Sequence, residues 1–159
     1  MATMKQLWWT AKDKIELKDV EIPAVGPNEV KVKIAYAALC ATDVHQVTMG
    51  VMGAKPPAPL GHEASGTIVE IGEKAAAAGY KVGDKVALFP VSHCGECEWC
   101  KKGMTQYCIN AKPTGAFAQY VVTDVKTIYK LPDNVDLKEY AIVEPTNCCR
   151  RAMDLAPTG

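Results

Sequence analysis

The chain has 159 residues, of which 48% are hydrophobic, and its 18 basic residues balance its 18 acidic residues. This length suits one domain with a hydrophobic core, so we expect residues 1–159 to form a single unit. The balanced charge offers no surplus to attract nucleic acid or an anionic membrane, and neither partner is expected. No apolar run approaches the roughly 20 residues of a membrane span and no secretory stretch opens the chain, so a cytoplasmic protein is expected.

Alternation of apolar and polar residues predicts strands over 15–22 and 30–36, which the turn-forming segment 23–28 divides. We expect these two strands to pair in antiparallel fashion. Further strands are predicted over 64–71, 85–89 and 117–129, each bounded by Gly, Pro or Asp. The sequence therefore predicts a mainly β domain with short helices.

The helix signals are short or come late in the chain. A short helix is predicted after Cys40, and Asp136 can cap a helix that begins at the next residue. Pro145 can open a second helix that ends at Leu155. The run Ala75–Gly79 is predicted to be a surface loop. No Gly-x-Gly-x-x-Gly turn follows a strand, so the sequence predicts no dinucleotide site within this chain.

Four of the seven cysteines form a run with the spacing Cys-x2-Cys-x2-Cys-x7-Cys, namely Cys94, Cys97, Cys100 and Cys108. Zn²⁺ takes four thiolates at about 2.3 Å, and two-residue spacers let successive side chains converge on one ion. A redox disulfide pair is the weaker alternative, because the cysteine count is odd and a reducing compartment disfavours disulfides. A fully ligated ion leaves no position for substrate, so we predict a structural zinc that is not a reaction centre.

A second group of metal-binding residue types lies in two short segments. Cys40 is followed by Asp43 and His45, and His62 is followed by Glu63. A thiolate, an imidazole and a carboxylate that leave room for water are typical of an open, catalytic zinc. Taken alone each half is a weak signal, since a single cysteine is as often a core residue as a ligand.

Several motifs together resemble the zinc-dependent medium-chain alcohol and polyol dehydrogenases, specifically their N-terminal GroES-like catalytic domain. They cover nearly the whole chain: Met4-Lys5 before a strand, Cys40-x-Thr42-Asp43-x-His45, Gly61-His62-Glu63-x-x-Gly66-x5-Gly72, Val82 to Val86, the four-cysteine run, Gly115 to Tyr120, and Glu144-Pro145. The resemblance implies a GroES-like, partly open β-barrel that carries a zinc-binding lobe.

The resemblance also implies roles for individual residues. It makes Cys40, His62, Glu63 and Glu144 the ligands of a catalytic zinc, and Asp43 the carboxylate that orients the imidazole of His62. Thr42 and His45 match a relay that carries the alcohol proton outward, and Glu63 matches a residue that can exchange with water at the metal. The chain departs from the family pattern after Glu144, where Cys148 lies one helical turn away and competes with Glu144 as the last ligand.

In this family a nucleotide-binding domain follows the helix that Glu144 begins, so we expect the chain to be truncated before that domain and inactive without it. NAD(P) would then bind only with the missing domain. The expected substrate is a small alcohol or polyol. Self-association, or a partner chain that covers the truncated face, is expected as well. The alternative is a non-enzymatic β scaffold or interaction module whose zinc serves folding alone.

Overall fold

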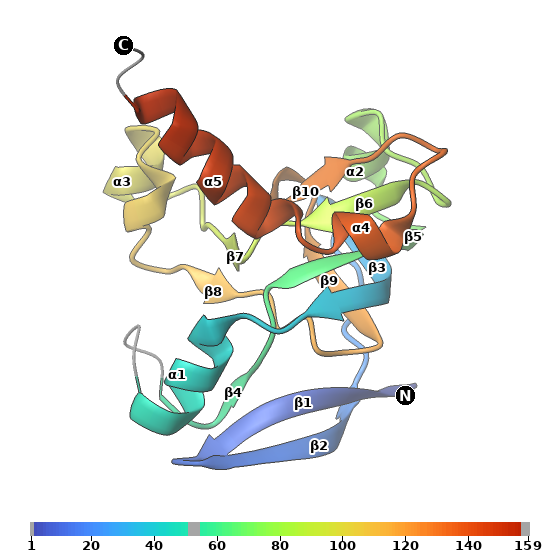
Figure 1. The fold of residues 1–159 in the computed structure, drawn as a ribbon. Coiled ribbons are helices and arrows are strands. Elements are labelled where there is room, and N and C mark those ends of the chain that lie inside the picture. The colour runs from blue at the N-terminus through green and yellow to red at the C-terminus, as the bar shows by residue number, and fades with distance from the viewer. Residues whose placement is uncertain (1, 51–54, 157–159) are drawn as a thin grey trace.

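The computed structural model describes residues 2–50 and 55–156. Its centre is a five-stranded antiparallel sheet in the order β10-β6-β5-β3-β9 (Figure 1). The strands are β3 (Glu29–Ala38), β5 (Glu63–Ile71), β6 (Lys85–Leu88), β9 (Tyr120–Asp124) and β10 (Ile128–Lys130). The curled sheet confirms the expected mainly β architecture.

The N-terminal strand β1 (Thr3–Ala11) pairs with β2 (Lys14–Glu21) and with the short β4 (Ala58–Pro59) in a separate three-stranded sheet. The predicted pairing of 15–22 with 30–36 is therefore wrong. Both segments are strands, but β3 pairs with β5 and β9 instead. Val30 and Val32 on β3 are fully buried, and a strand with such residues is placed best between two neighbours rather than at an edge.

The core lies on one face of the five-stranded sheet and is made of small and β-branched residues. It comprises Val30, Val32, Ala64, Ile68, Ala75, Val86, Leu88, Ala116, Val121 and Ile128. Ala75 is 0% exposed and lies on α2 (Glu73–Ala77), so the prediction of a surface loop over 75–79 is wrong for the helical part, although residues 76–79 are exposed as predicted. Ala-rich sequence favours a helix, and this one covers the end of the core.

The predicted long strand over 117–129 is divided into β9 and β10. The Asp124 carboxylate accepts a hydrogen bond from Lys126 N at 2.8 Å, and a 3₁₀ turn, η2 (Val125–Thr127), follows. Side chains of this kind offer the backbone an alternative to the strand ladder. The interruption lets β10 pair with β6 at the opposite end of the sheet from β9.

Helix α1 (Ala41–Met49) follows β3, as predicted. The Asp136 side chain caps α4 (Leu137–Tyr140), accepting a hydrogen bond from Lys138 N at 2.9 Å. The last helix, α5 (Val143–Leu155), begins two residues before Pro145, which lies in its first turn and is tolerated there. Among the described residues no helix is long and apolar enough to cross a membrane.

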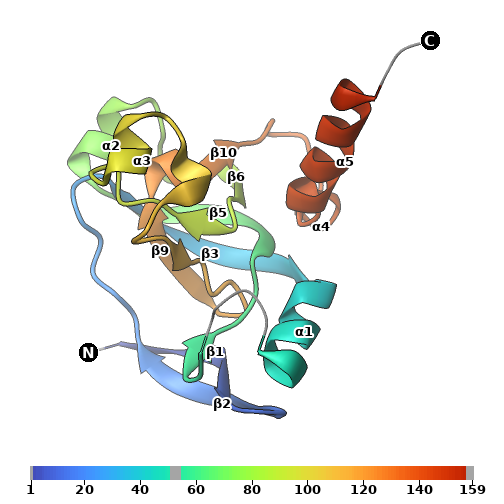
Figure 2. The same ribbon diagram turned by 90° about the vertical axis from the view of Figure 1, so that its left-hand side faces the viewer.

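A small lobe projects from the sheet. It consists of β7 (Val91–Ser92), α3 (Glu98–Lys101), the 3₁₀ turn η1 (Thr105–Tyr107) and β8 (Lys112–Pro113), with β7 and β8 paired at its base. Figure 2 shows the lobe and α5 apart from each other, with α1 below α5. The two groups of candidate metal ligands lie in this region.

Candidate metal centres

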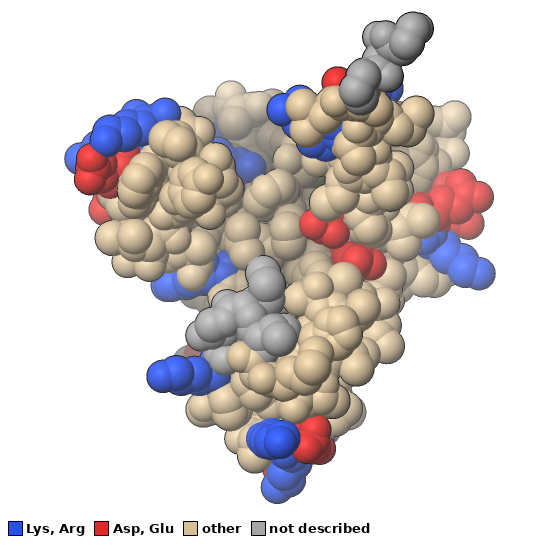
Figure 3. All heavy atoms as spheres, turned by 60° about the vertical axis from the view of Figure 1, so that its left-hand side comes forward, with Lys and Arg blue, Asp and Glu red and all other residues tan. Residues whose placement is uncertain are grey.

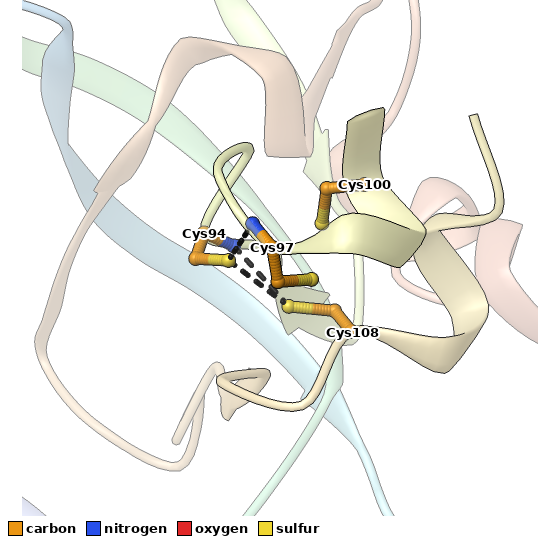
Figure 4. A group of neighbouring side chains, drawn as sticks. All are labelled: Cys94, Cys97, Cys100 and Cys108. Carbon is orange, nitrogen blue, oxygen red and sulfur yellow. Dashed lines mark hydrogen bonds between the residues drawn. The ribbon is translucent and has the colours of Figure 1, made fainter. Parts of the chain in front are cut away.

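The four-cysteine run closes into one cluster within the lobe (Figure 4). Sulfur atoms of Cys94, Cys97, Cys100 and Cys108 all lie within 4.8 Å of one another, and Cys94 and Cys108 are 3.5 Å apart. Four thiolates at about 2.3 Å from a tetrahedral ion would be separated by roughly 3.8 Å. The cluster therefore has the size that zinc requires. Within the same lobe, the rings of Trp99 and Tyr107 lie 5.5 Å apart, measured between their centroids.

The thiols of this cluster differ in acidity. Hydrogen bonds from the backbone N–H groups of Glu96 and Cys97 lower the pKa of Cys94 to about 6. Burial, followed by the hydrogen bond with Cys97, raises the pKa of Cys100 to about 12. A metal ion must therefore displace protons when it binds here, which makes its affinity increase with pH.

The second group of ligands is assembled by the pairing of β3 with β5. Ala38 near the end of β3 lies opposite Glu63 at the start of β5. Cys40, two residues beyond Ala38, and His62, just before Glu63, are thereby brought side by side. Donor atoms of Cys40, His62 and Glu63 lie within 4.8 Å of one another, and Glu63 is buried. Two segments more than twenty residues apart thus form a thiolate–imidazole–carboxylate group.

The Asp43 carboxylate connects the segment that contains Cys40 to the segment that contains His62. Cys40 is the N-cap of α1, and its backbone N–H donates to Asp43 Oδ2 at 3.1 Å, while Thr42 N donates to Cys40 Sγ at 3.4 Å. The other carboxylate oxygen, Oδ1, accepts from Gly61 N at 3.1 Å and lies 3.4 Å from Nδ1 of His62. Because Nδ1 faces Asp43, the Nε2 atom of His62 is left for a ligand.

The pKa values of Asp43 and His62 follow from this geometry. Burial alone would raise the pKa of Asp43, but hydrogen bonds from His62 and from the N–H groups of Cys40 and Gly61 outweigh it and hold that pKa below its usual value. The hydrogen bond to Asp43 raises the pKa of His62 to about 9, despite the opposing effect of burial. Without a metal the imidazole is therefore protonated at neutral pH, and an ion must displace that proton.

A cavity of about 530 Å³ opens beside His62. Figure 3 shows this face, hollowed between the lobe, α1 and α5. The lining residues come from these three parts and from the segment 59–62 that leads from β4 to β5: Thr42, Asp43, Gln46, Pro59, Leu60, Gly61, His62, Pro90, Val91, Ala111, Pro113 and Glu144. The wall is mainly apolar with a few convergent polar groups, as is typical of small-molecule sites.

The remaining predicted site residues are distributed around this cavity. Thr42 and Glu144 line it, but Glu144 lies outside the group of three ligands. Cys148 is exposed on α5, with Sγ 3.8 Å from Glu144 Oε1, and the charge of Glu144 raises its pKa. His45 is exposed on α1 and is not among the residues, within the described ranges, that line the cavity.

Two further residues belong to this site, and the sequence analysis gave neither of them a role there. Gly61 has φ +90°, a conformation that favours glycine, and its N–H donates to Asp43. Gln46 lines the cavity one helical turn after Thr42, and the i, i+4 spacing on the predicted helix is the signal that could have found it.

A family model described as the alcohol dehydrogenase GroES-like domain matches residues 26–133. The chain belongs to this family. This confirms the resemblance drawn from the motifs, and the curled sheet with its projecting lobe is the fold that the family's solved structures share.

The relatives to which this alcohol dehydrogenase GroES-like domain is similar are named as dehydrogenases or reductases. The 2-dehydro-3-deoxy-L-galactonate 5-dehydrogenase of Pseudoalteromonas atlantica is 40% identical over 135 residues, which cover 79% of this chain and 39% of that protein. Sorbitol dehydrogenase of Bombyx mori is 32% identical over 151 residues, which cover 87% of this chain and 43% of that protein. The chain thus spans about two fifths of these relatives.

Solved structures agree with the sequence comparison. Galactitol-1-phosphate dehydrogenase from Escherichia coli superposes with a TM-score of 0.82 at 29% identity, covering 96% of this chain and 45% of that one. For 2R,3R-butanediol dehydrogenase from Bacillus subtilis the TM-score is 0.81 at 27% identity, with 98% and 48% covered.

Proposed function

We propose that this chain is the metal-binding catalytic domain of a zinc-dependent alcohol or polyol dehydrogenase that works with NAD(P). One observation carries the proposal: Cys40, His62 and Glu63 present three donor atoms within 4.8 Å, beside a cavity with an apolar wall. Three protein ligands that leave a position open are typical of catalytic zinc, whereas the cluster of four cysteines is closed.

Individual residues of the chain would have separate roles in the oxidation of the alcohol. Bound zinc supplies a Lewis acid that lowers the pKa of an alcohol oxygen. Asp43 holds the imidazole of His62 in the tautomer that leaves Nε2 free. The hydroxyl of Thr42, at the cavity wall, has one donor and two acceptor sites and can pass a proton without ionising. His45, exposed on α1, would release that proton to solvent.

The hydride must leave to a nicotinamide, because no protein side chain can accept it. The sequence contains no Gly-x-Gly-x-x-Gly turn, and the chain spans 39% and 43% of two dehydrogenases to which it is similar. We therefore propose that NAD(P) is bound by a nucleotide-binding domain and that this chain alone does not turn over. The relatives named for sorbitol and butanediol support a secondary alcohol or polyol as substrate.

Metal analysis tests the proposal directly. We expect two zinc ions per chain, of which one resists a chelator and the other exchanges readily. The Cys40→Ser variant should lose only the exchangeable ion, and the Cys97→Ser variant only the inert one. A single inert zinc in the unaltered protein would favour the alternative, a β scaffold in which zinc serves folding alone.

Turnover gives a second test. The chain by itself should show no NAD(P)-linked oxidation of sorbitol, xylitol or 2,3-butanediol, while a fusion to the nucleotide-binding domain of a relative should oxidise at least one of them. A clear rate from the isolated chain would contradict the expected dependence on a second domain.

A further inference from the structure

A metal ion bound to His62 requires a neutral imidazole, and the other charged side chains that line the cavity then share one sign. They are Asp43 and Glu144, and no Lys or Arg of the described residues lines this cavity. The thiolate of Cys40 and the carboxylate of Glu63 would already balance the charge of a divalent ion there. Asp43 and Glu144 then leave the site with a surplus of negative charge, which repels an anionic group.

Two cations that lie near the lining residues in sequence line other cavities. Lys112, between Ala111 and Pro113, lines a separate cavity together with Glu29 and Asp124. On α5, the Arg150 guanidinium donates to Asp154 at 2.9 Å and lines another pocket.

The uncharged polar group of the wall comes from α1. Gln46 lies one turn after Thr42, so both side chains lie on the same face of the helix, and both line the cavity. A carboxamide can both donate to and accept from hydroxyl groups.

We propose that the substrate is a neutral polyol and that Gln46 is a specificity-determining residue that binds one of its hydroxyls. This inference rests on the proposed function and sharpens it. Relatives of the chain include enzymes named for neutral polyols, for a polyol phosphate and for a sugar acid. Of these three classes, the wall of this cavity suits the first. A phosphate or carboxylate would meet the surplus charge with no cation from the lining residues.

The test uses the 159-residue chain with zinc in the cysteine cluster and Co²⁺ in the exchangeable site, whose visible spectrum reports changes in coordination. Imidazole is titrated first, as a neutral ligand for the open position, and then D-arabitol and D-arabitol phosphate. We expect a response to imidazole, a response to D-arabitol, and at least tenfold weaker binding of the phosphate ester. No response to imidazole would remove the proposed metal centre and this inference with it.

A charge substitution makes the test specific for Gln46. Gln46→Lys should favour D-arabitol phosphate over D-arabitol by at least tenfold relative to the unaltered chain. The control is Val44→Lys, which adds the same charge to the exposed face of α1 and should leave the preference unchanged. Retention of the inert zinc checks that both variants fold.

A response to imidazole, together with equal or tighter binding of the phosphate ester by the unaltered chain, would overturn the inference alone. Arg151 would then be the cation to test by substitution with alanine, since it lies two helical turns, about 10 Å, beyond Glu144 on the same face of α5. If Val44→Lys and Gln46→Lys changed the preference for D-arabitol phosphate over D-arabitol equally, the role of Gln46 would also be overturned. The effect would then come from the added charge and not from its position.

Discussion

The carboxylate of Asp43 lies 3.4 Å from Nδ1 of His62, and the Asp43 side chain is only 4% exposed. The same carboxylate accepts hydrogen bonds from the backbone of Cys40 and of Gly61. One buried side chain therefore holds the thiolate segment and the imidazole segment in a common frame. Its replacement should affect both at once.

Asp43→Asn should weaken metal binding at the Cys40–His62–Glu63 site by roughly 10- to 100-fold, the usual cost of altering a group that orients a ligating histidine. Zinc competition with a coloured chelator measures this change. Asp136→Asn is the matched control, because Asp136 also caps a helix but lies at α4. The inert zinc should be unchanged in both variants, and equal weakening in the control would contradict the role given to Asp43.

Gly61→Ala should disturb the same site through the backbone. A Cβ at this position would meet Phe117 N at 2.6 Å, and φ is +90°. Gly83→Ala is the control, since φ is +94° there but nothing lies within 4 Å of the added atom. We expect Gly61→Ala to cost about 1–3 kcal/mol more stability than Gly83→Ala in urea unfolding, and to lose the exchangeable metal. Equal costs would show that the clash is relieved.

Metal binding beside His62 should be steeply dependent on pH. The hydrogen bond to Asp43 raises the pKa of His62 from 6.5 to about 9, so zinc competes with a proton at neutral pH and its affinity should increase until about pH 9. For the metal-free chain the sign is opposite. The proton on His62 stabilises the fold fully below pH 6.5, and that contribution is lost as pH rises through about 9.

Asp43→Asn should flatten both profiles, because it removes the group that raises this pKa. Zinc affinity and urea unfolding, each followed from pH 6 to pH 10 in the unaltered chain and the variant, measure the two effects. A zinc affinity that does not change over this interval would show that His62 is not a ligand.

Removal of the ion from the cysteine cluster should unfold the lobe. Cys97→Ser should lose the inert zinc and about 3 kcal/mol or more of stability, because binding free energy at such sites is also folding free energy. Cys149→Ser alters an exposed thiol and should do neither. Amide hydrogen exchange should locate the loss within residues 91–113 while the five-stranded sheet stays protected.

Glu144 and Cys148 can be separated by the same metal measurement. Glu144 lines the cavity and Cys148 is exposed, with Sγ 3.8 Å from Glu144 Oε1. We expect Glu144→Gln to weaken the exchangeable site by at least fivefold and Cys148→Ser to leave it within twofold. The reverse order would make the thiol the last ligand.

Local patterns were sufficient for the positions of most strands and for the cysteine cluster, because both depend on residues close together in the chain. Which strands pair with each other could not be predicted from local patterns. The segment 15–22 was expected to pair with the next strand, but the partner of each strand depends on which residues must be buried, and Val32 needs neighbours on both sides. The burial of Ala75 likewise depends on the rest of the core.

In the metal site, too, some features follow from local sequence patterns and others depend on the rest of the fold. The motifs identified Cys40, His62 and Glu63, and the register of β3 on β5 accounts for their proximity. The bond from Gly61 N to Asp43 depends on a backbone conformation that no residue pattern specifies. The exposed position of His45 was also not predictable, because a step of one residue along a helix turns the side chain by about 100° and decides whether it faces the cavity or the solvent.

Cys40 is both a candidate ligand and the residue that begins α1, with Asp43 completing the reciprocal hydrogen bonds of that helix end. An incoming ion would therefore meet a rigid cradle, and little of its binding energy would be consumed in ordering the chain. A chelator should then remove the ion from the Cys40–His62–Glu63 site without unfolding the surrounding structure. Loading and unloading of the reactive ion would be reversible events in an intact protein, in contrast to the lobe, where the ion and the fold are gained or lost together.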